Sequence, residues 1–247
     1  MAANIRFCEP KHTHHPAIAE FHNTWSSLTY VALGLWAVSR VKGSRTPALA
    51  LISIGVGSAL FHATLQRWSE WLDEGSMLFF VNVCLHQLIR HLRARDPADL
   101  DIACGALSCT NLLLFGHYMR SNSFAAFLHQ FTLQLVVMMG LVCCGWRGSR
   151  VFRPRAHRAF RHRSGQCARM VAYIATGRVA WELEQQLTNS GRLFDWRTSA
   201  DPALCADTTL LHWWHVVWHA LSALAALEMV LLLDALNSNG LRSRGEG

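Results

Sequence analysis

Apolar positions along this chain of 247 residues gather into seven long stretches that are separated by polar segments. A helix needs about 20 mostly apolar residues to cross a bilayer, and each stretch is close to that length or longer. Short connections between most stretches favour an up-down bundle with antiparallel neighbours. The pattern therefore predicts an all-α, polytopic membrane protein whose seven transmembrane helices cover residues 24–41, 47–66, 71–91, 99–118, 123–146, 167–188 and 208–235.

The sixth stretch is the least apolar, because charged and amide side chains interrupt it, among them Arg178, Glu182 and Glu184. Such groups are tolerated at membrane depth when they face protein or a water-filled cavity. We therefore expect this helix to lie inside a bundle. The spacing alone leaves the role of Glu184 open.

The second stretch carries a run of small residues, which are Gly55, Gly57, Ser58 and Ala59. Small side chains let helix backbones approach closely inside a membrane. The run therefore predicts a tight contact between this helix and a neighbour.

Lysine and arginine are divided unevenly between the two sides of the predicted bundle. Of 23 such residues, 15 lie in segments 40–47, 90–98 and 147–166 and in the tail after 236, and six lie on the other side. Because cytoplasmic loops carry the excess of basic residues, this asymmetry places the N-terminus in the lumen and the C-terminus in the cytosol. Opposite sides require an odd number of spans, which agrees with seven.

The predicted organisation is a lumenal N-terminal arm at 1–23, a membrane domain at 24–235 and a cytosolic tail at 236–247. The first residues do not show the charged-then-apolar pattern of a signal peptide, so we expect the first span to direct the chain to a membrane. In a eukaryote that membrane would belong to the endoplasmic reticulum or the Golgi. The net charge of +7 is confined mainly to loops, which disfavours a nucleic-acid partner, and no segment indicates an obligate protein partner.

Three histidines in the predicted spans have the spacing of a metal site. His215 and His219 form an i, i+4 pair in H-V-V-W-H, which places both side chains on one face of a helix, and His62 lies near the end of the second span. Two histidines on one helix with a third from a neighbour are typical of a zinc site with an open fourth position. The chain has 14 histidines, so other pairs such as His212 and His215 stay open.

Asp73 and Ser58 are expected at the same depth as these histidines. In the predicted topology, His62 lies about one turn from the lumenal end of its span and Asp73 lies just inside the next span. A carboxylate there could move the proton of the attacking water, and the Ser58 hydroxyl could stabilise an oxyanion. The alternatives are an N-cap role for Asp73 and a packing role for Ser58. Haem ligation by His86, His117 or His129 is the remaining metal alternative, but no spacing supports it.

Three segments together resemble the alkaline ceramidase family: I-A-E-F-H-N-T-W-S-S-L-T-Y, G-S-A-L-F-H-A-T-L-Q-R-W-S-E-W-L-D-E and H-V-V-W-H-A-L-S-A-L. That family belongs to a wider group of seven-span hydrolases that includes the adiponectin-receptor type. The resemblance implies zinc ligation by His62, His215 and His219, and catalytic roles for Asp73 and Ser58. It implies zinc-dependent hydrolysis of ceramide to sphingosine and a fatty acid.

The resemblance also implies a calcium site in the N-terminal arm. Glu9 and Glu20 fall on two of its ligand positions, whereas Arg6 and Lys11 stand where the family carries oxygen ligands. Calcium binds six to eight oxygens, so two cations among the ligand positions make this site doubtful. Either cation could instead balance the charge of the two glutamates.

Two cysteines are candidates for a disulfide bond, because Cys8 and Cys205 are the only ones in predicted lumenal segments. The resemblance places the arm near the segment that precedes the last span, which would bring the two together. Two unpaired thiols are the alternative.

Two other functions remain open at this stage. One is a lipid sensor or receptor of the adiponectin-receptor type with weak or no hydrolase activity. The other is a scaffold or transporter in which the histidine cluster is structural.

Overall fold

The computed structural model describes residues 3, 5, 7–93, 96–121, 123–188 and 212–241. Their regular structure is helical, and these residues form no β-strand. The helices are α1 (Phe21–Arg40), α2 (Thr46–Thr64), α3 (Arg67–Arg90), α4 (Pro97–Ser121), α5 (Phe124–Trp146), α6 (Pro154–His162), α7 (Ser164–Thr188) and α9 (His212–Leu241).

Each predicted span coincides with one of the long helices, which confirms the all-α class. Within the described part of the chain, four segments are long and apolar enough to cross a membrane by length and composition, namely α2, α4, α5 and residues 213–238 of α9. The protein is therefore a membrane protein. The seven-span count and the orientation of the termini stay predictions, because α1, α3 and α7 carry more polar residues than these four.

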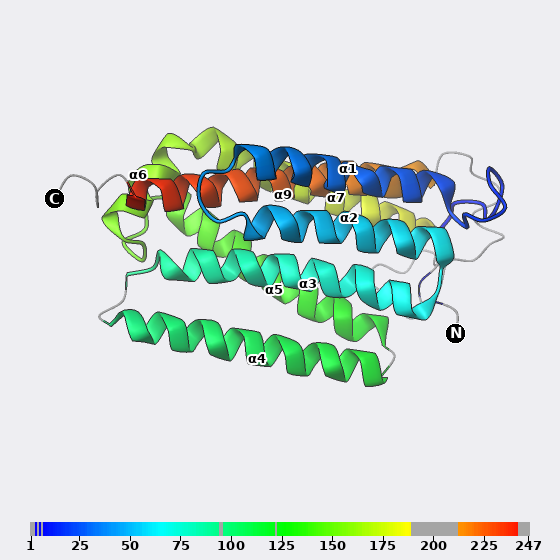
Figure 1. Ribbon diagram of the computed structural model, residues 1–247, viewed down its shortest axis with the longest axis horizontal. Helices are drawn as coiled ribbons and strands as arrows, with labels where there is room; N and C mark the ends of the chain where they lie inside the picture. Colours follow the sequence, from blue (N-terminus) through cyan, green and yellow to red (C-terminus); the bar gives the residue numbers. More distant parts are fainter. Residues whose placement is uncertain are drawn as a thin grey trace.

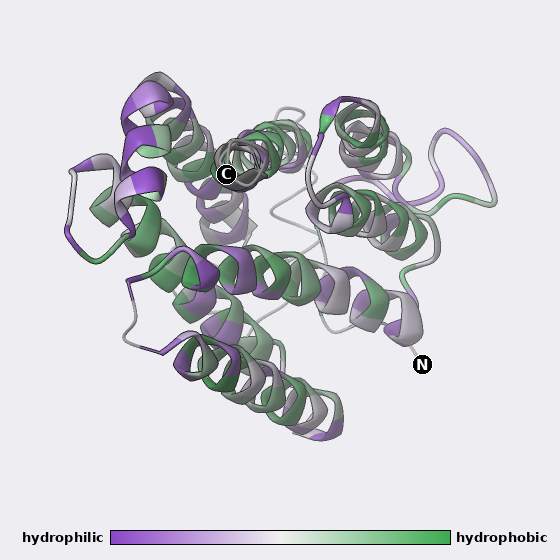
Figure 2. Ribbon diagram, turned by 60° about the vertical axis from the view of Figure 1, so that its left-hand side comes forward, coloured by the Kyte–Doolittle hydropathy of each residue, from purple (hydrophilic) through white to green (hydrophobic). Residues whose placement is uncertain are grey.

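The long helices run side by side along the long axis of the molecule, with the start of α1 and the C-terminal end of α9 at opposite ends of the bundle (Figure 1). α9 packs along α1 and α7, and α2 lies between α1 and α3. α4 lies at the edge against α3 and α5, and its outward side chains include Leu112 and Leu113, which are 72% and 75% exposed. This apolar outer face is expected of a helix that contacts lipid (Figure 2).

The arginine-rich segment predicted as a loop over 147–166 contains a short helix, α6, and α7 begins at Ser164 rather than at 167. Pro154 stands in the first turn of α6, where a missing backbone N–H costs nothing. Ala156, Ala159 and Phe160 are buried on one face, and this spacing explains why a segment rich in arginine folds as a helix.

The small-residue run of α2 makes the close contacts predicted for it. A Cβ added at Gly55 would lie 2.6 Å from Val31 Cγ2, and one added at Gly57 would lie 2.9 Å from the carbonyl oxygen of Leu72. Both distances are too short for a side chain, so α1 and α3 approach α2 on either side of Ser58. These two glycines thereby bring Ser58 and Asp73 into one region of the bundle.

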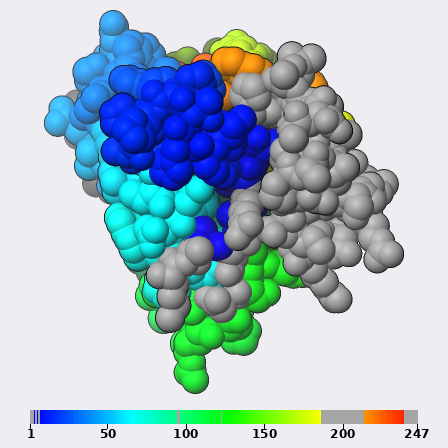
Figure 3. Space-filling model, turned by 90° about the vertical axis from the view of Figure 1, so that its right-hand side faces the viewer, coloured from blue at the N-terminus to red at the C-terminus, as the bar shows by residue number. Residues whose placement is uncertain are grey.

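The N-terminal arm lies across one end of the helices. Its backbone is bonded to the end of α2, since the N–H groups of Ala19 and Glu20 donate to the carbonyls of Ala63 (2.9 Å) and His62 (3.0 Å). Figure 3 looks onto this end and shows the arm in dark blue against the cyan segment that joins α2 to α3. The arm therefore covers the end of the bundle where His62 lies.

Candidate metal centre

His62, His215 and His219 meet inside the bundle, as the sequence predicted. Each offers a ring nitrogen, and the three nitrogens lie within 4.8 Å of one another. All three side chains are at most 3% exposed. α2 supplies one ligand and two successive turns of α9 supply the others, so the packing of α2 and α9 beside α1 assembles the cluster.

Each histidine is oriented by a hydrogen bond at Nδ1. Glu20 Oε2 lies 2.6 Å from Nδ1 of His62, and Glu184 Oε2 lies 3.0 Å from Nδ1 of His215. Ser26 Oγ lies 2.7 Å from Nδ1 of His219. Acceptors at these positions assign the proton to Nδ1 and leave the Nε2 lone pairs to face a common ion.

The donor set fits zinc. Neutral imidazole nitrogens are common zinc ligands, and three of them leave a fourth position for water or substrate. Partners on the far nitrogens raise the basicity of the ligands and fix their orientation. A buried group of three histidines with no other purpose would be costly at membrane depth. The residues present therefore suit a divalent metal, and the donor set does not by itself identify which one.

Glu20 links the cluster to Lys11 of the arm. Its second oxygen forms an ion pair with the Lys11 ammonium, and its side chain is fully buried. Burial raises the pKa of Glu20, but the hydrogen bond from His62 and the ion pair with Lys11 outweigh burial and lower the pKa overall. Glu20 therefore stays ionised at any physiological pH and can hold the ring of His62.

The oxygens implied as calcium ligands are occupied by nitrogen donors of the protein. Lys11 Nζ donates to the carbonyls of Phe7 and Glu9, both at 2.9 Å, in addition to Glu20. The Glu9 carboxylate accepts the backbone N–H groups of His22 (2.5 Å) and Asn23 (2.8 Å) at the start of α1. This arrangement does not fit a calcium ion, because an ammonium group stands among the oxygens.

Ser58 and Asp73 lie beside the cluster. Ser58 Oγ is 3.5 Å from Nε2 of His219 and 2.9 Å from Ser27 Oγ. Asp73 lines the same cavity as Ser58, His215 and His219. A hydroxyl thus lies next to one histidine of the cluster, and a carboxylate lines the same cavity.

The arm also contributes directly to the centre. The ring of Phe7 lies 4.0 Å from that of His215 and 5.1 Å from that of His62, measured between centroids. The backbone N–H of Cys8 donates to Glu184 Oε1 at 3.3 Å. The arm therefore shields the cluster at its end and holds the carboxylate that orients His215.

Sequence reasoning missed the part that four residues play in this centre. Glu20 was expected only as a calcium ligand, Glu184 had no assigned role, and Ser26 and Phe7 were not considered. Glu20 directly precedes α1, and nothing in the sequence around it indicates that it contacts His62, 42 residues later in the chain. The contact exists only because the arm folds back over α2.

Three sequence expectations fall on parts of the chain that the structure does not describe. Cys205 and Arg6 lie outside the described residues, and so does the side chain of His212. The disulfide between Cys8 and Cys205 therefore stays a prediction, as does the contribution of Arg6 to the arm.

Together, the fold and the cluster define a helical membrane protein with three buried histidines that could hold a metal ion. A sequence model of the family described as "Ceramidase" matches residues 1–245. The chain therefore belongs to the ceramidase family. This confirms the resemblance that the sequence motifs indicated.

Two curated proteins are similar to this chain. A putative alkaline ceramidase of Dictyostelium discoideum is 30% identical over 109 residues, which are 35% of this chain and 38% of that protein. An alkaline ceramidase of Arabidopsis thaliana is 26% identical over 196 residues, which are 73% of this chain and 68% of that protein.

Proposed function

We propose that the protein is a zinc-dependent amidase that cleaves ceramide within the membrane into sphingosine and a fatty acid. Membership of the ceramidase family and the two alkaline ceramidases among its relatives support the substrate. The observation that carries the proposal is the buried histidine cluster at the wall of a cavity that Asp73 and Ser58 also line.

The shape of the interior suits a lipid amide. The cavity beside the histidines shares five wall residues with a second cavity, namely Tyr30, Ile54, Met77, Phe131 and Trp218. Because the two share these walls, a substrate amide at the histidines could extend an alkyl chain into the second cavity.

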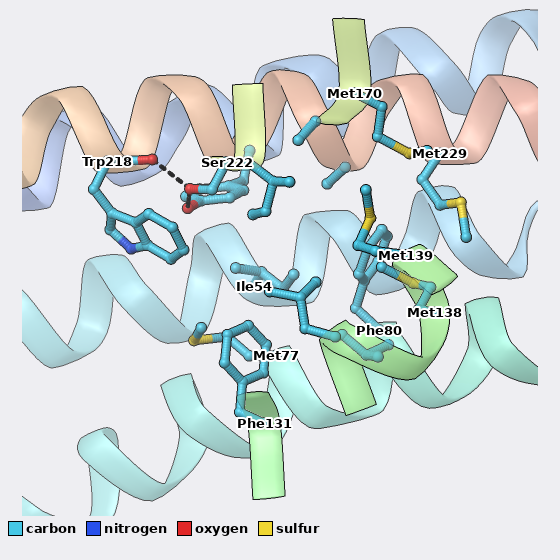
Figure 4. Close-up of a pocket in the computed structure, with 16 residues that line it drawn as sticks. Ile54, Met77, Phe80, Phe131, Met138, Met139, Met170, Trp218, Ser222 and Met229 are labelled. Atoms are coloured by element: carbon cyan, nitrogen blue, oxygen red, sulfur yellow. Dashed lines mark hydrogen bonds between the residues drawn. The ribbon is translucent and has the colours of Figure 1, made fainter. Parts of the chain in front are cut away.

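The second cavity is lined almost wholly by apolar side chains (Figure 4). Five of the seven methionines of the chain face it, which are Met77, Met138, Met139, Met170 and Met229. Methionine is flexible and fills irregular space, so such a wall adapts to alkyl chains of different shapes. We assign this cavity to a hydrocarbon chain of the substrate.

The proposed mechanism divides the work among a few side chains. When bound, zinc supplies a Lewis acid that acidifies water and polarises a carbonyl. Asp73 accepts the proton of the attacking water, and Ser58 donates a hydrogen bond to the oxygen that becomes negative. Asp73 then returns the proton to the leaving nitrogen, which departs as the amine of sphingosine. The nitrogen protons of the three histidines stay on Nδ1, held by Glu20, Glu184 and Ser26.

We further propose that the reaction does not require calcium. The Lys11 ammonium lies among the oxygens of the arm, where the resemblance implied a calcium ion. The proposed topology has seven spans, with the arm and the metal centre on the lumenal side of an endoplasmic reticulum or Golgi membrane. The organisation into arm, membrane domain and cytosolic tail belongs to the same proposal.

Product analysis tests this function. Purified protein in lipid nanodiscs should convert ceramide into equimolar sphingosine and fatty acid, and a strong chelator should stop the release until zinc is restored. Full zinc occupancy without turnover would instead favour the lipid sensor of the adiponectin-receptor type. Turnover that persists after the metal has been removed would refute the metal-dependent mechanism.

A further inference from the structure

Glu70, Asp73 and Glu74 are three acidic residues in the first turns of α3, and their carboxyl groups differ in their hydrogen-bond partners. Glu70 is fully buried, and its carboxylate accepts from Arg67 Nη1 at 2.8 Å and from the backbone N–H of Ile5 at 3.3 Å. Asp73 has the role proposed above. Glu74 is assigned no part in the mechanism.

One oxygen of Glu74 is fixed and the other is not. Oε2 accepts a hydrogen bond from the hydroxyl of Tyr118, whose side chain is fully buried. Oε1 is buried and has no hydrogen-bond partner among the described residues. Leaving a buried acceptor unpaired costs free energy, so such a group in a folded protein calls for an explanation.

The position of Glu74 supplies that explanation. Its side chain is only 3% exposed and lines the same cavity as Asp73, Ser58, His215 and His219. It follows Asp73 directly in α3, so the two Cα atoms differ by about 1.5 Å along the helix axis, and both side chains line this cavity. A substrate whose amide lies between Asp73 and the histidines would place the neighbouring polar atoms of its head within the same cavity.

We propose that Glu74, held in place by Tyr118, binds a hydroxyl group of the lipid substrate next to the amide that is cleaved. This inference rests on the proposed function. The sphingoid base of ceramide carries one hydroxyl on each carbon that flanks the nitrogen-bearing carbon, and both are hydrogen-bond donors. An unpaired carboxyl oxygen at the wall of a buried cavity is an acceptor matched to such a donor. Glu74 would thus distinguish hydroxylated lipid amides from those that lack the hydroxyl.

Substrates that each lack one hydroxyl test this assignment. Ceramide and its 1-deoxy and 3-deoxy analogues are compared by kcat/KM and by Kd, for the wild type and for Glu74→Met. The wild type should prefer ceramide over one of the analogues by about 5- to 100-fold, as expected when the analogue leaves a buried acceptor unpaired. In Glu74→Met that preference should fall to within about twofold of unity, while the preference against the other analogue is retained. The analogue affected identifies the hydroxyl.

A double variant protects the test against misfolding. Glu74→Met leaves the Tyr118 hydroxyl unpaired, whereas Glu74→Met with Tyr118→Phe replaces both partners by apolar groups and is expected to fold more stably. Glu228→Met removes a carboxylate that pairs with Arg169 on a distant turn of α9, so it should keep the wild-type preference.

The outcomes separate the two proposals. A wild type that hydrolyses neither ceramide nor its analogues refutes the proposed function, and the Kd ratios then decide the role of Glu74. A wild type that treats ceramide and both analogues alike in kcat/KM and in Kd refutes the hydroxyl site. If the double variant keeps the wild-type preference for ceramide, the hydroxyl site is refuted as well. Glu74 would then be only a structural partner of Tyr118.

Discussion

Replacing Glu184 by alanine should weaken metal binding without removing a metal ligand. The fully buried Glu184 accepts from His215 Nδ1 at 3.0 Å and from the N–H of Cys8 at 3.3 Å. Without it, the proton on His215 Nδ1 loses its acceptor and the ring loses its fixed orientation. Loss of such a partner typically costs 10- to 100-fold in metal affinity, which corresponds to about 1.4–2.8 kcal/mol.

A ranking of the three orienting groups follows from their charge. Glu20 and Glu184 are carboxylates, whereas Ser26 offers a neutral hydroxyl to His219 at 2.7 Å. A neutral hydrogen bond contributes about 0.5–1.5 kcal/mol, so Ser26→Ala should weaken metal binding by roughly 2- to 10-fold. Glu184→Gln keeps an oxygen that accepts from Nδ1 and should recover much of the loss seen in Glu184→Ala.

Zinc affinity is measured by competition with a chelator of known affinity, on protein whose melting temperature and circular dichroism are recorded in parallel. Glu228→Ala is the matched control, because this carboxylate pairs with Arg169 and lies nine residues, or about 13 Å, beyond His219 along α9. Wild-type zinc affinity in Glu184→Ala would refute the orienting role. Equal losses in Glu184→Ala and Glu228→Ala would show a general effect of stability.

Three further changes test other parts of the account. Hydrolysis should not change when calcium or a calcium chelator is added, and strong activation of the wild type by calcium would contradict the proposed calcium independence. Lys11→Met should lower the free energy of unfolding by about 1–3 kcal/mol, because the Glu20 carboxylate loses its cation. Met229→Trp should fill part of the apolar cavity and reduce kcat/KM for long-chain relative to short-chain ceramides by about tenfold. Met119→Trp is the control, because the Met119 side chain is exposed, and it should leave this ratio unchanged. An unchanged ratio in Met229→Trp would show that the alkyl chain lies elsewhere. Mass mapping of unreduced, alkylated protein should find Cys8 joined to Cys205, and labelling of both without reductant would exclude the bridge.

Much of the fold could be predicted from the sequence, because long apolar stretches form helices in a membrane wherever they pack. The helix α6 was missed, since its arginines conceal a narrow apolar face of Ala156, Ala159 and Phe160. Hydropathy also cannot establish the span count where polar residues face the interior of the bundle, as Glu184 does in α7.

The three histidines could be predicted to lie together for two reasons. The i, i+4 spacing of His215 and His219 is a local signal, and the predicted topology places His62 at the same membrane depth as this pair. The groups that orient them could not, because Glu20, Ser26 and Glu184 reach the histidines through contacts between segments far apart in the chain. The unpaired oxygen of Glu74 is likewise visible only once α3 and α4 are packed.

The most direct test of the central claim is zinc content and sphingosine release measured on the same preparation of His219→Ala. The control is His91→Ala, since His91 is bonded to Asn237 at the other end of α3. The account predicts one zinc per chain and full hydrolysis in the wild type and in His91→Ala, and the loss of both in His219→Ala. Full zinc occupancy in His219→Ala, or hydrolysis that survives there without zinc, would contradict it.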